Sequence, residues 1–163
     1  MKALTIWQPW ASLIIAGAKP FEFRGWRAPR SMIGQRIVIH AGSHRVDRLE
    51  VGQMLVILRE REKFAQFAAE TCLHADLAIP VLERARAGQL PMSAGIGSAV
   101  IGEPRNGFDI AAEFGVERAN DSDRDDQANW GWPMLDVEAW AEPVPMRGAQ
   151  GFWTWPTPEQ ALL

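Results

Sequence analysis

The residues best suited to bind a ligand are concentrated near the start of the chain, in the stretch IWQPWASLIIAGAKPFEFRGWRAP. Three charged residues, Lys19, Glu22 and Arg24, follow one another closely, and two tryptophans, Trp10 and Trp26, flank them. Cations can contact phosphate, a carboxylate can accept hydrogen bonds from a base amine, and a flat ring can stack on a base. This combination predicts a cleft that binds a nucleotide or a piece of nucleic acid.

Each of these charged residues also has a purely structural interpretation. Lys19 follows the glycine that ends a predicted helix, and a cation is favoured near the C-terminus of a helix. Glu22 and Arg24 stand two residues apart on one strand face, where an exposed ion pair would contribute less than about 1 kcal/mol. The sequence leaves the structural and the functional interpretations open.

Two further polar residues are candidates for the same cleft. Gln8 is either the cap of the helix that follows it or a residue that contacts base edges. His40 ends a predicted strand, where we expect it to form hydrogen bonds that face the cleft. His44 lies four residues further on, but that spacing brings two side chains together only on a helix, and Gly42 intervenes. We therefore predict no metal site, and we expect no cofactor.

The charge distribution favours phosphate contacts in one part of an otherwise acidic chain. The formal net charge of the whole chain is −3, which argues against a general polyanion binder. Residues 19–48 contain seven basic and two acidic residues, so this segment carries a local charge of +5. Basic residues interleaved with aromatic ones are typical of nucleic-acid sites, although long arginines can also simply cover apolar surface.

Length and composition predict one domain over residues 1–163, with 47% hydrophobic residues to build its core. The single cysteine, Cys72, excludes a disulfide framework and indicates a reducing compartment. The longest uncharged apolar run, from Pro9 to Ala18, is shorter than the roughly 20 residues that span a bilayer. We therefore expect a soluble, cytoplasmic protein with no membrane contact, and the oligomeric state is left open.

The candidate residues are predicted to lie on a strand, a helix and a second strand. The chain up to Trp7 alternates as a strand that turns Trp7 inward. Pro9 suits the first position of a helix, and Gly17 suits the position just after its end. The stretch KPFEFRGW has a period of two, so Phe21 and Phe23 share a core face while the charged residues share the other face.

The rest of the chain predicts further strands around one long helical segment. Residues 36–42 are predicted to form a strand, and helical spacings dominate around 46–92, which we interpret as a helical insertion. Residues 98–105 are predicted to form a strand opened by a Gly-rich turn, and 109–129 contain the acidic loop ERANDSDRDDQ. Two late strands close the chain. Five or six short strands with helices among them favour an α+β fold with a small, partly closed barrel.

The opening stretch resembles the start of an ASCH domain, a family of the PUA-like superfamily. The family pattern is a strand, a helix that begins Q-P-aromatic-A, and then G-x-K-x-x-E-x-R-x-W. The matching residues are Gln8, Pro9, Trp10, Ala11, Gly17, Lys19, Glu22, Arg24 and Trp26. RIVIHA is similar to the family's second strand, and GSAVIG and GAQGFWTW match more loosely. The resemblance implies a small PUA-like β-barrel of five or six strands capped by helices, with a cleft between barrel and first helix.

The resemblance also implies that this cleft binds RNA or other nucleic acid. The leading hypothesis from the residues is a module that binds RNA, single-stranded nucleic acid or a nucleotide. In this hypothesis a base stacks on Trp10 and Trp26, and Lys19 and Arg24 contact phosphate. Such binding is expected to weaken steeply with salt, because it releases counterions.

Two other hypotheses remain, and the sequence leaves open whether the protein is an enzyme. One branch of the family resembles a small amidohydrolase that deacetylates N4-acetylcytidine with a lysine, a threonine three residues later and a distant glutamate. Lys19 matches the lysine, but Glu22 stands in the threonine position, so a hydrolase here would use Lys19 and Glu22 for acid–base work. The other hypothesis is a protein-interaction domain whose helical insertion and acidic loop contact the partner.

Overall fold

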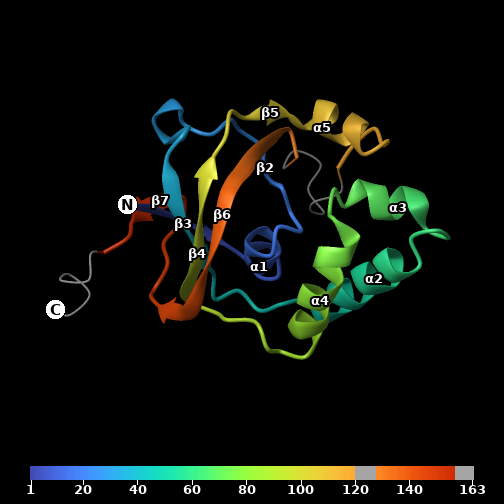
Figure 1. Cartoon of the computed structure of the whole chain (residues 1–163), viewed down its shortest axis with the longest axis horizontal. Helices are drawn as coiled ribbons and strands as arrows, with labels where there is room; N and C mark the ends of the chain where they lie inside the picture. Colours follow the sequence, from blue (N-terminus) through green and yellow to red (C-terminus); the bar gives the residue numbers. More distant parts are fainter. Residues whose placement is uncertain (120–127, 157–163) are drawn as a thin grey trace.

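A curled mixed sheet forms the body of the protein in the computed structural model, which describes residues 1–119 and 128–156 (Figure 1). In chain order the strands are β1 (Lys2–Ile6), β2 (Phe21–Arg24), β3 (Arg36–Ala41), β4 (Ala94–Ile101), β5 (Arg105–Asn106), β6 (Trp130–Pro145) and β7 (Phe152–Thr154). Their order in the sheet is β2-β6-β4-β3-β1-β7, and β5 pairs with β6. β1 runs parallel to β3, and the other pairs are antiparallel. The α+β half-barrel predicted from the sequence is confirmed, and the short β5 brings the strand number to seven.

The helical segments lie in the hollow of this sheet and beside it. They are α1 (Trp10–Ile15), the 3₁₀ turn η1 (Arg30–Met32), α2 (Arg48–Arg59), α3 (Ala65–Glu70), α4 (Ala75–Arg86) and α5 (Gly107–Glu113). α1 lies in the hollow of the curled sheet, and α2 to α4 form a separate group beside it (Figure 1). Because α2 to α4 follow β3 and precede β4, they are the helical insertion predicted around 46–92.

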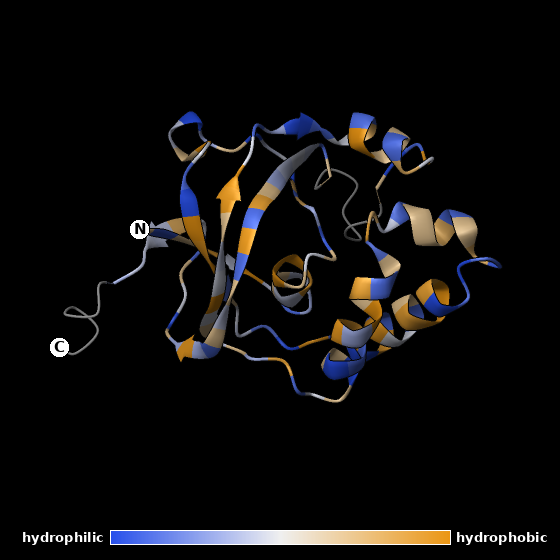
Figure 2. Cartoon of the chain, in the orientation of Figure 1, coloured by the Kyte–Doolittle hydropathy of each residue, from blue (hydrophilic) through white to orange (hydrophobic). Residues whose placement is uncertain are grey.

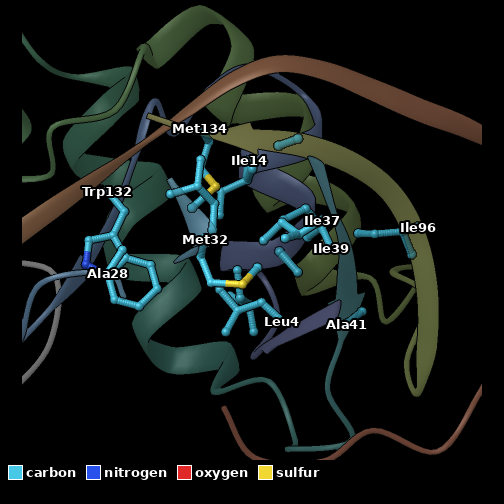
Figure 3. Packing of buried hydrophobic residues seen from close by; sticks show 14 of the residues in the cluster. Leu4, Ile14, Ala28, Met32, Ile37, Ile39, Ala41, Ile96, Trp132 and Met134 are labelled. Atoms are coloured by element: carbon cyan, nitrogen blue, oxygen red, sulfur yellow. The ribbon is translucent and has the colours of Figure 1, made fainter. Parts of the chain in front are cut away.

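The main hydrophobic core fills the space between α1 and the inner face of the sheet. Side chains from α1, β1, β3 and β6 converge there, as Figure 3 shows for Ile14, Leu4, Ile37, Ile39 and Trp132. Leu4, Ile14, Ile37 and Ile39 are at most 1% exposed. This burial holds α1 firmly inside the half-barrel, because each such side chain stabilises the fold by roughly 1.5–3 kcal/mol.

A second hydrophobic core joins the other side of α1 to the helical insertion. Leu13 and Ala18 pack there with apolar residues of α2 and α4, among them Leu55 and Leu82, and all four are fully buried. Figure 2 shows the apolar sides of the inserted helices. The six residues of α1 are therefore covered by the sheet on one side and by the insertion on the other, which explains their apolar composition.

Two local predictions are wrong. Trp7 is 56% exposed and does not turn inward, because β1 ends at Ile6. The glycines before position 98 lie within β4 and do not form a turn. The predicted acidic loop follows helix α5 and is untested, because its residues 120–127 lie outside the described residues.

β6 is a long strand that continues through two prolines near its end. Residues up to Pro145 belong to β6, and Pro145 lies opposite Ala94 of β4. The register of β2 covers only the first residues of β6, from Trp130 to Pro133. The far end of β6 therefore pairs with β4 alone, and a strand with one unpaired side tolerates proline, which has no N–H to donate.

Candidate functional site

Lys19 enters the interior directly after α1 ends. Gly17 adopts the left-handed conformation at φ +74°, which glycine reaches without strain. The backbone N–H groups of Ala18 and Lys19 then donate to the Leu13 carbonyl at 2.9 and 3.0 Å. This turn directs the lysine into the protein, where only 2% of the residue is exposed. The interpretation of Lys19 as a surface lysine is therefore wrong.

Aromatic rings surround the Lys19 ammonium. Its Nζ lies 5.4 Å from the centre of the Trp10 ring and 5.0 Å from the centre of the Phe23 ring. A cation over an aromatic face is attracted by the ring quadrupole, more strongly when water is excluded. The attraction to these rings offsets part of the unfavourable free energy of removing the ammonium group from water.

Glu22 and Arg24 form an ion pair on β2. An Arg24 Nη2 to Glu22 Oε1 distance of 3.0 Å confirms the pairing that the two-residue spacing indicates. The side chains are 22% and 8% exposed for Arg24 and Glu22, so the pair is not the exposed one that the structural interpretation assumed. Glu22 lies opposite Trp132 in the β2–β6 register, which places the pair on the barrel side of β2.

The Arg24 guanidinium lies between two tryptophans and keeps one donor available. Its Cζ is 5.8 Å from the Trp132 ring centre and 6.0 Å from the Trp26 ring centre. Its Nε is buried and has no hydrogen-bond partner among the described residues. A buried donor without a partner is costly, and an acceptor on a bound ligand would remove that cost.

The two candidate stacking residues differ in exposure. Trp26 is 55% exposed, and its carbonyl accepts a hydrogen bond from Trp132 Nε1 at 3.0 Å, which holds the loop after β2 against β6. Trp10 is half-buried and packs against both hydrophobic cores. Trp26 therefore offers the more open ring beside the charged cluster, while Trp10 also supports α1.

Gln8 acts as a helix cap in this structure. Its Oε1 accepts from the Ser12 backbone N–H at 3.0 Å, and its Nε2 donates to Ser12 Oγ and to the Pro91 carbonyl, both at 2.8 Å. The residue is 3% exposed. Of the two interpretations that the sequence left open, these contacts favour the cap, because both ends of the amide are already engaged.

His40 does not join the other candidates. It lies on the face of β3 opposite Ile39, which packs in the core with α1, and it is 1% exposed. Its Nδ1 is 3.3 Å from Thr5 Oγ1, its Nε2 is 2.8 Å from the Met146 carbonyl, and the Trp153 ring packs against it at nearly a right angle. His40 therefore lies on the side of the sheet that faces away from α1, where the segment around β7 encloses it.

The basic segment is less positive than its composition suggests. At least three of its residues have acidic partners in the described structure, namely Arg24, Arg27 and Arg36. The partners of the last two are Glu103 and Asp136, far away in the chain. The arginines of this segment without an ion pair to any described residue are Arg30, Arg45 and Arg48.

Sequence reasoning missed the part that Trp132 plays in the site. Phe23 was assigned to the core, and Trp132 was not singled out, yet Phe23 contacts the Lys19 ammonium and Trp132 contacts the Arg24 guanidinium. The period-two alternation of β2 and β6 indicates that Phe23 and Trp132 each lie on one defined face of their strand. Their meeting with the charged residues depends on strand register, which the sequence does not specify.

A separate groove lies on the outside of the helical insertion. Its volume is about 440 Å³, and apolar side chains such as Leu49, Val56 and Phe64 line it, with Arg48 at its border. It lacks the paired charges of the Lys19 cleft. Within residues 1–119 and 128–156, no group of three or more His, Cys, Asp or Glu side chains could hold a metal ion. No helix in the same ranges is long and apolar enough to cross a bilayer.

The half-barrel sheet with α1 in its hollow defines a PUA-like barrel. The family model of the ASCH domain matches residues 4–98, so the chain belongs to the ASCH domain family. The crystal structure of ASCH from Zymomonas mobilis superposes with a TM-score of 0.51 at 14% identity, covering 99% of this chain and 90% of that chain. That likeness shows a shared fold. No curated protein matches the sequence.

Proposed function

We propose that this ASCH-domain protein binds a nucleotide, free or as a unit of single-stranded RNA, in the cleft formed by α1 and β2. The observation that carries the proposal is the arrangement of buried Lys19 and Glu22 beside Arg24, whose Nε has no partner among the described residues. The exposed ring of Trp26 completes the site. These groups offer donors, an acceptor and a stacking surface, which are the contacts that a nucleobase requires.

The energetics of the cluster support a binding role. Removing charged groups from water is expensive, and an ion pair inside a protein often contributes no net stability compared with apolar residues of similar size. Lys19, Glu22 and Arg24 nevertheless lie together beside a barrel that has ample apolar core elsewhere. Charged groups clustered in this way occur preferentially at functional sites, because a ligand then provides the compensating contacts.

The same geometry favours one base over a long stretch of phosphate backbone. Lys19 and Glu22 are almost fully buried, so they can reach only a small group that enters the cleft. Several arginines of the basic segment are already engaged with acidic partners. The cleft therefore suits a single base or nucleotide, as in proteins that bind unstacked bases of single-stranded RNA.

Binding of nucleoside monophosphates and of a labelled single-stranded RNA octamer tests the proposal. Wild type, Lys19→Met and Lys63→Met are compared by calorimetry and fluorescence anisotropy. Lys63 is the matched control, because its side chain is 70% exposed on the helical insertion. We expect Lys19→Met to lose binding of both ligands and Lys63→Met to retain it.

Thermal melting confirms that each variant is folded, and Arg24→Gln provides a second change in the same cleft. Undiminished binding by folded Lys19→Met and Arg24→Gln would reject the cleft as the binding site. Absence of binding by wild type to every ligand in the series would reject the proposed function itself.

A hydrolase is the second candidate, because Lys19 and Glu22 are both buried and the Lys19 ammonium lies over the rings of Trp10 and Phe23. In that case Glu22 would take a proton from water, which attacks the acetyl carbonyl of an acylated nucleoside. The C–N bond would then break as Glu22 returns this proton to the leaving nitrogen, which gives acetic acid, ionised to acetate in water, and the free amine. Glu22 is already engaged in the ion pair with Arg24, so binding remains the primary proposal. Chromatographic detection of cytidine released from N4-acetylcytidine, and lost in Glu22→Gln, would support the hydrolase.

A further inference from the structure

Trp7 and His44 form a stacked pair outside the cleft. Their ring centres are 3.8 Å apart and their planes differ by 13°. Trp7 follows β1 and His44 follows β3, and these strands are parallel neighbours in which Ile6 lies opposite Ala41. Both residues therefore leave the sheet at the same edge. Trp7 is 56% exposed, an unusually open position for the largest apolar side chain.

The Trp7 ring is held in one orientation although it contributes little to the core. His44 covers one of its faces. A side chain at Gly42 would bring its Cβ to 3.2 Å from Trp7 Cδ1, so the edge of the ring lies close against the backbone there. With one face stacked and more than half of the residue exposed, the opposite face is left to solvent. A ring fixed in this way loses little conformational entropy when a ligand stacks on it.

Positive charge that is not neutralised by described acidic residues lies next to this pair along the chain. Arg45 directly follows His44, and Arg48 begins α2. Neither arginine forms an ion pair with a residue of the described ranges, whereas Arg27 and Arg36 do. Aromatic rings beside free cations are the combination that binds single-stranded nucleic acid, because bases stack on the rings and the backbone phosphates contact the cations.

The pair is also continuous with the cleft through the start of α1. The Trp7 carbonyl accepts a hydrogen bond from the Ala11 N–H at 3.2 Å, so one turn of chain connects Trp7 to α1. Trp10, in that same turn, contacts the Lys19 ammonium with its ring. We propose that Trp7 and His44 form a second stacking site, which binds another base of the single-stranded RNA whose first base occupies the cleft. This inference rests on the proposed function.

The test compares ligands of different length. Affinities of wild type, Trp7→Ala and Trp7→Phe are measured for a nucleoside monophosphate and for a single-stranded RNA octamer. Phe67→Ala is the matched control, since Phe67 is also 56% exposed but lies on α3. We expect Trp7→Ala to weaken octamer binding roughly tenfold, as loss of one stacked base does, and to leave monophosphate binding unchanged. The octamer affinity of Trp7→Phe should lie between those of wild type and Trp7→Ala, because a smaller ring provides a smaller stacking surface.

The outcomes distinguish this inference from the proposed function. Equal octamer affinities for Trp7→Ala and Phe67→Ala would overturn the second site, and monophosphate binding that still depends on Lys19 would leave the proposed function standing. Weaker monophosphate binding by Trp7→Ala would also overturn it, because Trp7 would then support α1. Octamer binding that requires Trp7 but not Lys19 would support the stacking site and reject the cleft. If wild type binds neither ligand, both proposals fail.

Discussion

The carboxylate of Glu22 lies 3.0 Å from the guanidinium of Arg24, with only 8% and 22% of the two side chains exposed. Both residues lie on the barrel side of the short strand β2, and the pair is shielded from water on most sides. It therefore holds the Arg24 guanidinium in place between the rings of Trp26 and Trp132.

Breaking this pair should destabilise the protein more than removing it entirely. Arg24→Met leaves the Glu22 carboxylate without its partner, and we expect a loss of about 2 kcal/mol, less than the 3–5 kcal/mol of a fully buried pair. The double variant Glu22→Gln/Arg24→Met should recover part of that loss, because neither member of the pair then remains without the other. Urea unfolding of the wild type, both single variants and the double variant measures the coupling. Strictly additive losses would show that the pair does not interact energetically.

Trp26 should matter for binding and little for stability. Because the residue is 55% exposed, we expect Trp26→Ala to change the free energy of unfolding by less than about 1 kcal/mol. Its nucleoside monophosphate affinity should fall roughly tenfold through loss of stacking. Phe108→Ala is the control, with a 52% exposed ring on α5. Equal affinities for the two variants would count against stacking on Trp26.

The salt dependence of RNA binding should be shallow. Contact of all seven basic residues in 19–48 with phosphates would give a slope of log affinity against log salt of about −5 for a single strand. The three arginines without a described acidic partner, Arg30, Arg45 and Arg48, predict a slope of about −2. Anisotropy titrations of the RNA octamer from low to physiological salt measure it. A slope near −5 would mean that the existing ion pairs open on binding.

Close packing of α1 against the sheet should depend on Gly97 of β4. A Cβ at this position would lie 2.4 Å from the Glu138 carbonyl oxygen and 2.6 Å from Ile15 Cδ1. We expect Gly97→Ala to destabilise by about 1–3 kcal/mol, since the backbone of β6 must shift. Gly52→Ala in α2 is the matched control, with no atom within 4 Å of the added Cβ, and it should stabilise by about 0.5–1 kcal/mol. Thermal melting compares the two, and similar effects would contradict the packing argument.

Glu113 should make stability depend on acidic pH. The hydrogen bond from Arg105 lowers the pKa of the Glu113 carboxyl below its ordinary value of 4.5. Because the pKa is lower in the folded state, this stabilisation is fully present above 4.5 and is lost as the pH falls through the folded-state pKa. Glu113→Gln should therefore melt below the wild type at neutral pH, and the two melting temperatures should converge in acid. A constant difference across the pH range would exclude the ionised carboxylate as its cause.

The charged cluster could be predicted because its geometry is local. Lys19, Glu22 and Arg24 lie within six positions, the left-handed turn at Gly17 needs a glycine, and period-two alternation places Glu22 and Arg24 on one face. The same alternation places Ile37 and Ile39 on one face of β3, and both pack in the core. The ASCH pattern follows this local order, which is why the family was evident from the opening stretch.

Contacts between distant segments could not be predicted in this way. The sequence indicated that His40 and Val38 share a face of β3, but not that the segment around β7 buries that face away from the cleft. It indicated a basic segment, but not that Arg27 meets Glu103, 76 positions away. The exposure of Trp7 likewise depended on where β1 ends and on His44 beyond β3.

The sequence by itself therefore determined the family, the main strands and helices, and the close spacing of Lys19, Glu22 and Arg24. Each of these depends on spacings of a few residues, which backbone geometry converts directly into shared faces and turns. Only the tertiary structure decided that Lys19 is buried, that Glu22 and Arg24 are shielded from water, and that much of the positive charge is neutralised. Burial and ion pairing depend on strand register and on the packing of the insertion against α1, and both join residues far apart in the chain.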